Sequence, residues 1–361
     1  MMSGTSIDGI DAVLINFFSE TEFNVVASQF TAFPAALRNA ISETALNNAD
    51  LTRESDSPLH HELASYYAQA VISLLKKSNT TPNSVNAIAN HGQTVKHEPN
   101  ASPPYSLQLG DGQLLANLTG IETISQFRQA DLAAGGQGAP LMPAFHNRIF
   151  LQGNENRFVL NLGGIANITC IDNPPIGFYT GPSNCLLDQW IERHQKEHYD
   201  ENGEWAASGT IIESVLAKLL RDPFLHAAFP KSTGTDHYNL AWLNKQIDDL
   251  ENYAPKDIQA TLVAFTTHTI KLALKQLKAT HGDIFVCGGG AKNEFLMSSL
   301  ATTLPSFSIK KTDALGVPCD LVEAIGFAWL GYCKLHNIPS NLPSVTGASK
   351  KLVLGKHFTP S

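Results

Sequence analysis

The stretch MSGTSIDGIDAVLINFF, residues 2–18, is the first of three glycine-containing turns that decide the predicted fold. It joins a short apolar start to an apolar strand. Backbone N–H groups freed by glycine, with the hydroxyls of Thr5 and Ser6, can surround phosphate oxygens, and Asp8 can hold a Mg²⁺ ion that bridges them. Taken alone, the stretch fits an ordinary glycine-containing hairpin as well. The two other turns therefore decide between these interpretations.

Both of the other turns support a phosphate site. FVLNLGGIANITCI, residues 158–171, repeats the order of strand, glycine turn and strand, with Gly163 and Gly164 at the turn. VCGGGAKN, residues 286–293, follows a buried strand and precedes a helix, where a nucleotide can approach the backbone closely. Three such turns in one chain favour a nucleotide bound in a cleft between two domains.

The segments after the two hairpins predict strands and helices in the same order twice. Apolar residues recur at helical spacing in residues 60–77 and 257–277. Residues 85–90 and 284–287 are short apolar runs typical of buried strands. Mixed strands and helices in this order indicate an α/β fold.

A polar turn within residues 148–157 marks the predicted domain boundary. We expect an N-terminal domain of residues 1–150 and a C-terminal domain of residues 151–361. The helix predicted over 321–335 is apolar on more than one face, so it can pack back on the first domain. The tail, residues 341–361, is predicted as loops because it is rich in turn residues.

Composition narrows the class of partner. The chain has 361 residues, 43% of them hydrophobic, a formal net charge of -8 and a pI near 5.9. That charge cannot neutralise a nucleic-acid backbone or an anionic membrane surface, so a small-molecule substrate is favoured. No apolar run reaches the length of a membrane span and no export signal begins the chain, so we expect a cytoplasmic protein.

The five cysteines form no C-x-x-C pair, which argues against disulfides and a zinc site. Cys185 follows a Gly-Pro turn, as some nucleophiles do, but packing is favoured over a nucleophilic role because no histidine stands in a diagnostic relation to it. The sequence leaves the oligomeric state open, with a homodimer as one alternative.

Five further polar residues are candidates for chemistry. In QFRQADLAAGGQGAP, Arg128 can orient a substrate or phosphate and Asp131 can fix that arginine, although a loop that needs glycine explains the segment equally well. His91 and Gln108 can contact sugar hydroxyls, or they are surface or satisfied core groups. Glu323 stands in an apolar helix, where a carboxylate needs a partner or a function.

These motifs, with WAASG, PKSTG, NLAWL, DIQATL and VEAIGFAWL, closely resemble the anhydro-N-acetylmuramic acid kinase family from residue 2 to the tail. The resemblance implies the fold of the sugar kinase, Hsp70 and actin superfamily, in which two ribonuclease-H-like domains close over ATP. It also implies a reaction of peptidoglycan recycling. ATP and water convert 1,6-anhydro-N-acetylmuramic acid to N-acetylmuramic acid 6-phosphate, and a carboxylate base activates the water that attacks the anomeric carbon.

Carried over motif by motif, the resemblance assigns residues to the nucleotide and to the sugar. The residues expected to hold ATP and Mg²⁺ are Gly4, Thr5, Ser6, Ile7, Asp8, Gly9, Ile10, Asp11, Gly163, Gly164, Gly288, Gly289 and Gly290. The residues expected at the sugar and the catalytic centre are Arg128, Asp131, Glu323, His91 and Gln108.

This chain departs from the family pattern at the centre of that site. The pattern F-D-x-G-P-G-N reads FYTGPSN here, so Tyr179 takes the position of the base. A phenol with a pKa of about 10 is a poor base at neutral pH. Gln126, Ala130 and Thr235 also replace charged residues of the pattern, and Asp188 is a candidate substitute base, with a helix-surface or capping role favoured over it.

Two hypotheses follow from these departures. The chain is an active kinase of the family, slow or altered in substrate choice, or it is a non-catalytic protein that binds nucleotide or amino sugar as a sensor or partner. An Hsp70-like ATPase shares the fold, but no peptide-binding domain follows. Relatives begin with several apolar residues before MSGTS, whereas this chain has Met1 and Met2, so the first strand of the hairpin is expected to be short.

Overall fold

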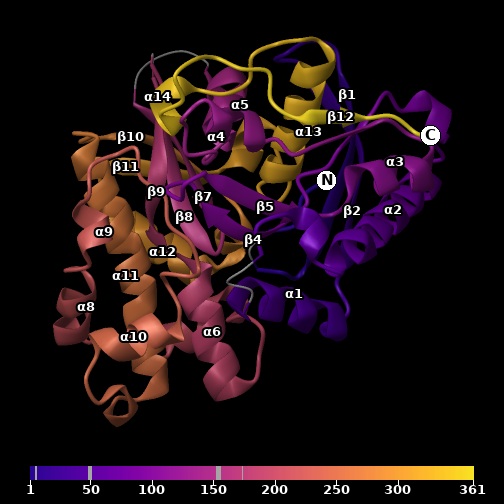
Figure 1. Cartoon of the computed structure of the whole chain (residues 1–361). Coiled ribbons are helices and arrows are strands. Elements are labelled where there is room, and N and C mark those ends of the chain that lie inside the picture. Colours follow the sequence, from indigo (N-terminus) through magenta and orange to yellow (C-terminus); the bar gives the residue numbers. More distant parts are fainter. Residues whose placement is uncertain (5, 48–50, 152–155, 173) are drawn as a thin grey trace. The chain divides into compact units, whose positions relative to one another are not determined.

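The computed structural model describes residues 1–4, 6–47, 51–151, 156–172 and 174–361 (Figure 1). The chain folds into two compact units. Unit 1 comprises Met1–Ile149 and Glu323–Ser361, and unit 2 comprises Phe150–Val322. We expected a second domain that runs to residue 361, whereas the residues from Glu323 onward belong to unit 1.

Unit 2 contains a five-stranded sheet in the order β11-β10-β7-β8-β9. Its first three strands along the chain pair antiparallel, and β10 and β11 add to β7 in parallel. This is the strand order of ribonuclease-H-like domains, and the predicted α/β class is confirmed. The strands are β7 (Arg157–Leu162), β8 (Ile165–Ile171), β9 (Ile176–Pro182), β10 (Gly282–Cys287) and β11 (Phe307–Lys311).

Helices cover the sheet of unit 2. The longest, α11, begins at a proline, which favours the first turn, and packs its apolar side against β8 and β9 (Figure 1). Phe265 and Ile270 of α11 are fully buried. The helices are α6 (Asn184–Gln195), α7 (Glu204–Ala207), α8 (Glu213–Leu219), α9 (Pro223–His226), α10 (Leu240–Gln246), α11 (Pro255–Gln276) and α12 (Glu294–Thr303).

Unit 1 has the same strand order as the sheet of unit 2, but some of its strands are very short. The Met1 amine donates to the Ala89 carbonyl at 2.6 Å, Met2 pairs antiparallel with Asp11, and Ser3 pairs parallel with Gln93. Residues 1–3 therefore lie between β1 and β3. The strands are β1 (Gly9–Phe17), β2 (Phe23–Ala32), β3 (Ile88–Ala89), β4 (Gln93–Glu98), β5 (Tyr105–Leu109), β6 (Thr123–Ser125) and β12 (Lys356–Phe358).

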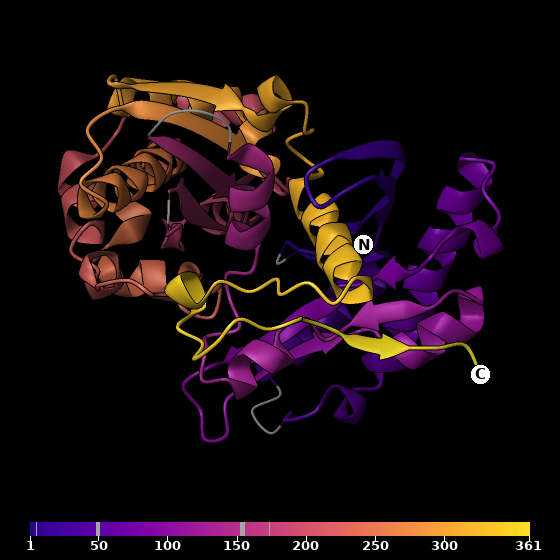
Figure 2. The ribbon, with the colours of Figure 1, turned by 90° about the horizontal axis from the view of Figure 1, so that it is seen from above.

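The C-terminal segment completes unit 1. Strand β12 pairs antiparallel with β6, and β6 pairs parallel with β3 (Figure 2). The prediction of loops throughout residues 341–361 is wrong here, because a short helix, α14 (Pro343–Thr346), and β12 both form in that tail. The pairing of β12 depends on a partner strand more than 200 residues earlier, which local sequence cannot reveal.

The remaining helices of unit 1 pack on its strands. Leu63, Tyr67 and Leu74 lie on the buried side of α2, which packs against β1 and β2. Gly326 lets α13 approach α5 closely, since a Cβ there would collide with the sulfur of Met142. The helices are α1 (Ala35–Asn47), α2 (Leu59–Lys77), α3 (Gly112–Thr119), α4 (Gln129–Ala133), α5 (Met142–Phe150) and α13 (Val322–Leu335).

None of the helices in the described ranges has the length and apolar character needed to cross a membrane.

Candidate functional site

The Gly163–Gly164 turn of unit 2 is attached to the start of α6. The Gly164 carbonyl accepts hydrogen bonds from the N–H groups of Ser183 and Cys185, both at 3.0 Å. The Gly163 carbonyl accepts from the N–H of Asn184 at 3.1 Å. The carbonyls of the turn are thus directed to α6, and its N–H groups are the polar groups that could face a phosphate.

The Gly288–Gly290 turn lies against the same end of the sheet. Gly288 has a φ of 84°, and a Cβ there would collide with the Asn161 side chain and lie 2.9 Å from the Leu162 carbonyl. The Asn184 amide donates to that Leu162 carbonyl at 3.0 Å. Both glycine turns of unit 2 therefore meet the start of α6 at the carboxyl end of β7, which is where open α/β sheets bind ligands.

Replacing Gly288 with alanine is expected to lower the free energy of unfolding by about 1–3 kcal/mol, because the side chain demands both a strained φ and a collision with backbone. Urea denaturation measures the change. Gly289→Ala is the matched control, since a Cβ there would meet only the Asn184 amide at 3.7 Å, an ordinary contact. Equal free energies of unfolding for the two variants would contradict the close packing of Gly288 against Asn161 and Leu162.

The turn of residues 4–9 belongs to unit 1. The Ile7 N–H donates to the Gly4 carbonyl at 3.2 Å, and the Gln93 amide donates to the same oxygen at 3.1 Å. The Ser6 hydroxyl donates to Oδ1 of the exposed Asp8 at 2.8 Å. Thr5 lies outside the described residues. Gly9, Ile10 and Asp11 begin β1.

Asp8 is the residue expected to hold Mg²⁺. Among the described residues, no group of three or more His, Cys, Asp or Glu side chains could hold a metal ion by itself. A single exposed carboxylate fits Mg²⁺ in nucleotide sites, because that ion keeps several waters and takes its other ligands from phosphates.

Tyr179 is the middle residue of β9, the strand that leads into α6. It stands opposite Asn167 of β8, beside a bulge at which the register shifts. Its backbone N–H donates to the Lys231 carbonyl at 3.2 Å, and its side chain is partly exposed. Two residues later, Gly181 pairs with Ala166, next to the glycine turn of β7 and β8. Tyr179, the position predicted for the base, is therefore in the same part of unit 2 as the glycine turns.

Lys231, from the PKSTG motif, is a buried cation beside this strand, and it was missed among the residues predicted for the site. Its ammonium donates to the carbonyls of Phe224 and Leu225 at 3.1 and 3.0 Å. It also lies over the rings of Phe178 and Phe224, at 5.5 and 5.0 Å. Burial lowers the pKa of Lys231 to about 8. The sequence signal that could have identified Lys231 is its place in PKSTG, directly after a proline and before turn residues.

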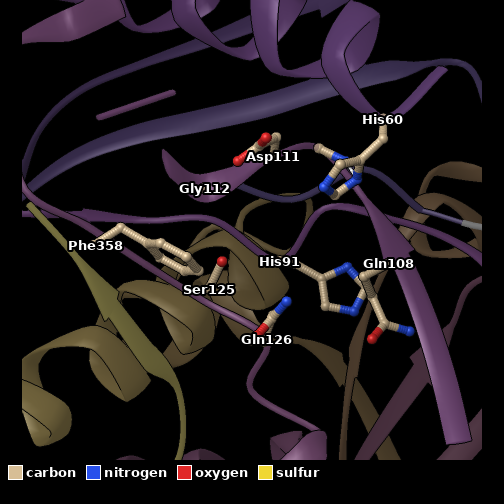
Figure 3. A pocket seen from close by; sticks show the side chains of 9 residues that line it. His60, His91, Gln108, Asp111, Gly112, Ser125, Gln126 and Phe358 are labelled. Atoms are coloured by element: carbon tan, nitrogen blue, oxygen red, sulfur yellow. Dashed lines mark hydrogen bonds between the residues drawn. The ribbon is translucent and has the colours of Figure 1, made fainter. Parts of the chain in front are cut away.

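Unit 1 holds a polar cavity of about 150 Å³ (Figure 3). Helix α2, the β4–β5 hairpin, the end of β6 and β12 contribute its walls. Its lining residues are His60, His91, Gln108, Gly110, Asp111, Gly112, Ser125, Gln126 and Phe358. Two residues predicted to bind sugar, His91 and Gln108, thus line one cavity. His60 and Phe358 were missed, because they come from a helix start and from the tail predicted as loop.

The protonation of His91 follows from its partner. Arg128 can only donate, so its 2.9 Å hydrogen bond to Nε2 of His91 makes that nitrogen the acceptor. Burial, followed by the Arg128 charge, lowers the pKa of His91 well below its usual value. The neutral ring therefore carries its proton on Nδ1, which is buried and has no hydrogen-bond partner in the described chain.

Gln108 and Gln126 add further neutral groups. The Gln108 amide donates to the Thr94 and Ser106 hydroxyls, whereas its buried Oε1 has no hydrogen-bond partner among the described residues. Gln126 follows β6 with a φ of 56°, a conformation that aspartate tolerates better than glutamine. A buried N–H donor and a buried carbonyl acceptor in one cavity suit the uncharged polar groups of a ligand, such as hydroxyls and amides.

Asp111 belongs to the same cavity but has a structural task. Its Oδ1 accepts hydrogen bonds from the N–H groups of Gln113 and Leu114, at 2.8 and 3.1 Å, and so caps α3. Its Oδ2 lies 3.2 Å from Nε2 of His61. Burial lowers the pKa of His60, which favours the neutral imidazole beside the Asp111 carboxylate.

Asp131 and Arg128 both bind the backbone of one residue, Gly138. Asp131 is fully buried, and its Oδ1 accepts from the Gly138 N–H at 2.8 Å, while Arg128 donates to the Gly138 carbonyl at 2.8 Å. The Oδ2 of Asp131 accepts from Asn341 at 3.0 Å and Thr346 at 2.7 Å. These bonds make Asp131 a support for the loop that holds Arg128. Glu323 lies in the first turn of α13, partly buried.

Comparisons with known proteins identify the same family over nearly the whole chain. The family model for anhydro-N-acetylmuramic acid kinase matches residues 1–360. The anhydro-N-acetylmuramic acid kinase of Haemophilus influenzae is 45% identical over 99% of this chain and 96% of its own length. That of Pasteurella multocida is 44% identical over 98% of this chain and 94% of its own. The chain belongs to the anhydro-N-acetylmuramic acid kinase family, a family of carbohydrate kinases.

Proposed function

We propose that this protein binds Mg-ATP and 1,6-anhydro-N-acetylmuramic acid, and that its conversion of the sugar to the 6-phosphate is severely impaired. Tyr179 carries the second part of the proposal. It occupies the base position of the family pattern, on the strand that leads into α6 beside the Gly163–Gly164 turn. A phenol is a weak base at neutral pH and is larger than the carboxylate it replaces.

The binding part rests on the unchanged turns and on the polar cavity. Backbone N–H groups at residues 4–9, 163–164 and 288–290 would hold the phosphates, with Asp8 on the metal ion. Bound Mg-ATP would supply the phosphoryl group and neutralise charge as it transfers. His91 Nδ1 and Gln108 Oε1 would bind sugar hydroxyls or the acetamido group, since each is buried and lacks a hydrogen-bond partner among the described residues.

Arg128 would position the sugar through His91. Its bonds to His91 and to the Gly138 carbonyl fix the imidazole with the Nδ1 proton available. Asp188 of α6 is the alternative carboxylate that could accept the proton of the attacking water. A helix-surface or capping role is favoured for Asp188, so it serves as the base only if the protein turns over normally.

A second candidate function is a sensor or partner protein that binds these ligands without converting them. The replacements at Tyr179, Gln126 and Ala130 favour it, because each removes a charge from the family pattern. One measurement distinguishes the two candidate functions, the formation of sugar 6-phosphate by purified protein over long incubation. An impaired kinase forms the product slowly, and a sensor or partner protein forms none.

Calorimetric titration tests the binding part. We expect saturable binding of Mg-ATP and of the anhydro sugar at micromolar to millimolar concentrations. Gln108→Leu is expected to weaken binding of the sugar by about tenfold or more, since it removes one buried acceptor. The affinity for Mg-ATP is expected to stay unchanged. No binding of either ligand at millimolar concentration would refute both candidate functions.

A further inference from the structure

A cavity of about 240 Å³ in unit 2 lies apart from the glycine turns, between the last turns of α6 and residues 250–255. Trp190 forms one wall and is 2% exposed. Its indole N–H donates to the Pro255 carbonyl at 2.8 Å, so the polar atom of the ring is satisfied and fixes its orientation. Leu250 and Tyr253 line the cavity with further apolar surface.

The polar groups of this cavity come from two neighbouring residues of α6 and one opposite. The Arg193 guanidinium lies 5.9 Å from the centre of the Trp190 ring and pairs with Glu251 at 3.1 Å. The Glu251 side chain is 86% exposed, so this pair is weak and easily exchanged for another carboxylate. The His194 ring lies 4.2 Å from that of Trp190, tilted by 51°, and its Nε2 is buried with no hydrogen-bond partner in the described ranges.

We propose that this cavity binds a planar aromatic carboxylate, with the ring against Trp190 and Tyr253 and the carboxylate on Arg193 in place of Glu251. The volume exceeds the roughly 150 Å³ of a cavity that accepts benzene, so it has room for a fused bicyclic ring. Aromatic rings pack favourably on one another, stacked or edge to face. Tyr253 is the partly exposed ring of the lining, and the buried Trp190 forms its floor. Arginine binds carboxylates through two parallel hydrogen bonds.

Other ligand classes fit less well. A sugar would bring several hydroxyls against walls made by Trp190, Leu250 and Pro255, where they would lose water without gaining partners. A phosphate would find a single arginine and apolar surface, whereas phosphate sites use several N–H groups or cations. The site is thus independent of the nucleotide and amino sugar proposed above.

Calorimetric titration with indole-3-acetate, and with indole as the matched ligand without a carboxylate, tests the proposal on the full chain. We expect one site per chain for indole-3-acetate and about tenfold weaker binding of indole. Arg193→Gln is expected to remove that difference between the ligands. Tyr253→Ala is expected to weaken both ligands, because it removes part of the wall, and Glu251→Gln to tighten indole-3-acetate, because it removes the competing carboxylate.

Lys218→Gln is the matched control, since Lys218 pairs with Asp248 at 3.4 Å in a similarly exposed ion pair away from the cavity lining. It should leave both affinities unchanged. Arg193 and Glu251 are on the rim, so their variants are expected to keep the circular dichroism and thermal midpoint of the wild type. Absence of saturable indole-3-acetate binding at millimolar concentration would overturn the proposal. An Arg193→Gln protein that still prefers indole-3-acetate over indole would also overturn it.

Discussion

Replacing Tyr179 with aspartate is expected to raise the rate of sugar 6-phosphate formation by about 10²–10⁴-fold, because a positioned general base typically contributes that much. The substitution places a carboxylate in the middle of β9 and removes the larger phenol. Aspartate is a poor strand residue, but Tyr179 is partly exposed on an edge strand beside a bulge, so the structural cost should be small. Mass spectrometry of the phosphorylated product measures the rate.

Tyr179→Asn is the matched control, since asparagine has the size of aspartate without its basicity. It should leave the rate near that of the wild type. Isotopically labelled water adds a second measurement at short reaction times, because ring opening by water places water oxygen at the anomeric carbon before the free hemiacetal exchanges with solvent. Wild-type protein that already turns over as fast as the aspartate variant would refute the proposed impairment and direct attention to Asp188.

Adding Gln126→Asp and Ala130→Arg to Tyr179→Asp should raise the rate further. Gln126 has a φ of 56°, which aspartate adopts at lower cost, and it lines the polar cavity with His91. Ala130 lies in the first turn of α4, directly after Arg128 and Gln129. A triple variant no faster than the single one would show that sugar orientation is intact in this chain.

Replacing Asp131 with alanine is expected to lower the free energy of unfolding by about 3–5 kcal/mol, since it leaves buried partners of a carboxylate without an acceptor. The N–H of Gly138, the Asn341 amide and the Thr346 hydroxyl all lose their bond to it. Gly136 is packed directly against this carboxylate, so a cavity also opens. Urea denaturation measures the loss.

Asp131→Asn should lower the free energy of unfolding by less than Asp131→Ala, because the asparagine carbonyl oxygen can still accept the hydrogen bond from the Gly138 N–H. Hydrogen exchange then locates the damage. Faster exchange is expected in residues 132–138 and 341–348, and unchanged exchange in α11 of unit 2. A loss below about 1 kcal/mol in Asp131→Ala would mean that these hydrogen bonds contribute little net stability.

Turns and long helices could be predicted because local chemistry determines them. Gly163 and Gly164 separate two apolar runs, and the strands β7 and β8 form on either side of them. The helix predicted over 257–277 is observed as α11, Pro255–Gln276, because its apolar residues recur at helical spacing. The same holds for α2, predicted over 60–77 and observed over Leu59–Lys77. The segment YAPKD was predicted as a loop, but its last three residues form the first turn of α11.

Contacts between distant residues could not be predicted in this way. Asp131 was predicted from the sequence to fix its neighbour Arg128, and it binds the N–H of Gly138, whose carbonyl Arg128 binds. Its bonds to Asn341 and Thr346, more than 200 residues later, carried no signal in the sequence. The polar cavity is likewise lined by both His60 and Phe358, which lie far apart in the sequence. A side chain that completes a site from the far end of the chain carries no local signal, whereas a glycine turn does.

The division of unit 1 into two segments also determines the order in which the protein can assemble on a ribosome. Unit 2, residues 150–322, is continuous, so all five strands of its sheet exist before β12 is synthesised. Residues 1–149 emerge first, but β6 lacks its partner β12 and Asp131 lacks Asn341 and Thr346 until translation is nearly finished. The half made first should therefore reach its native state last, and a nascent chain stalled before residue 341 should depend on chaperones.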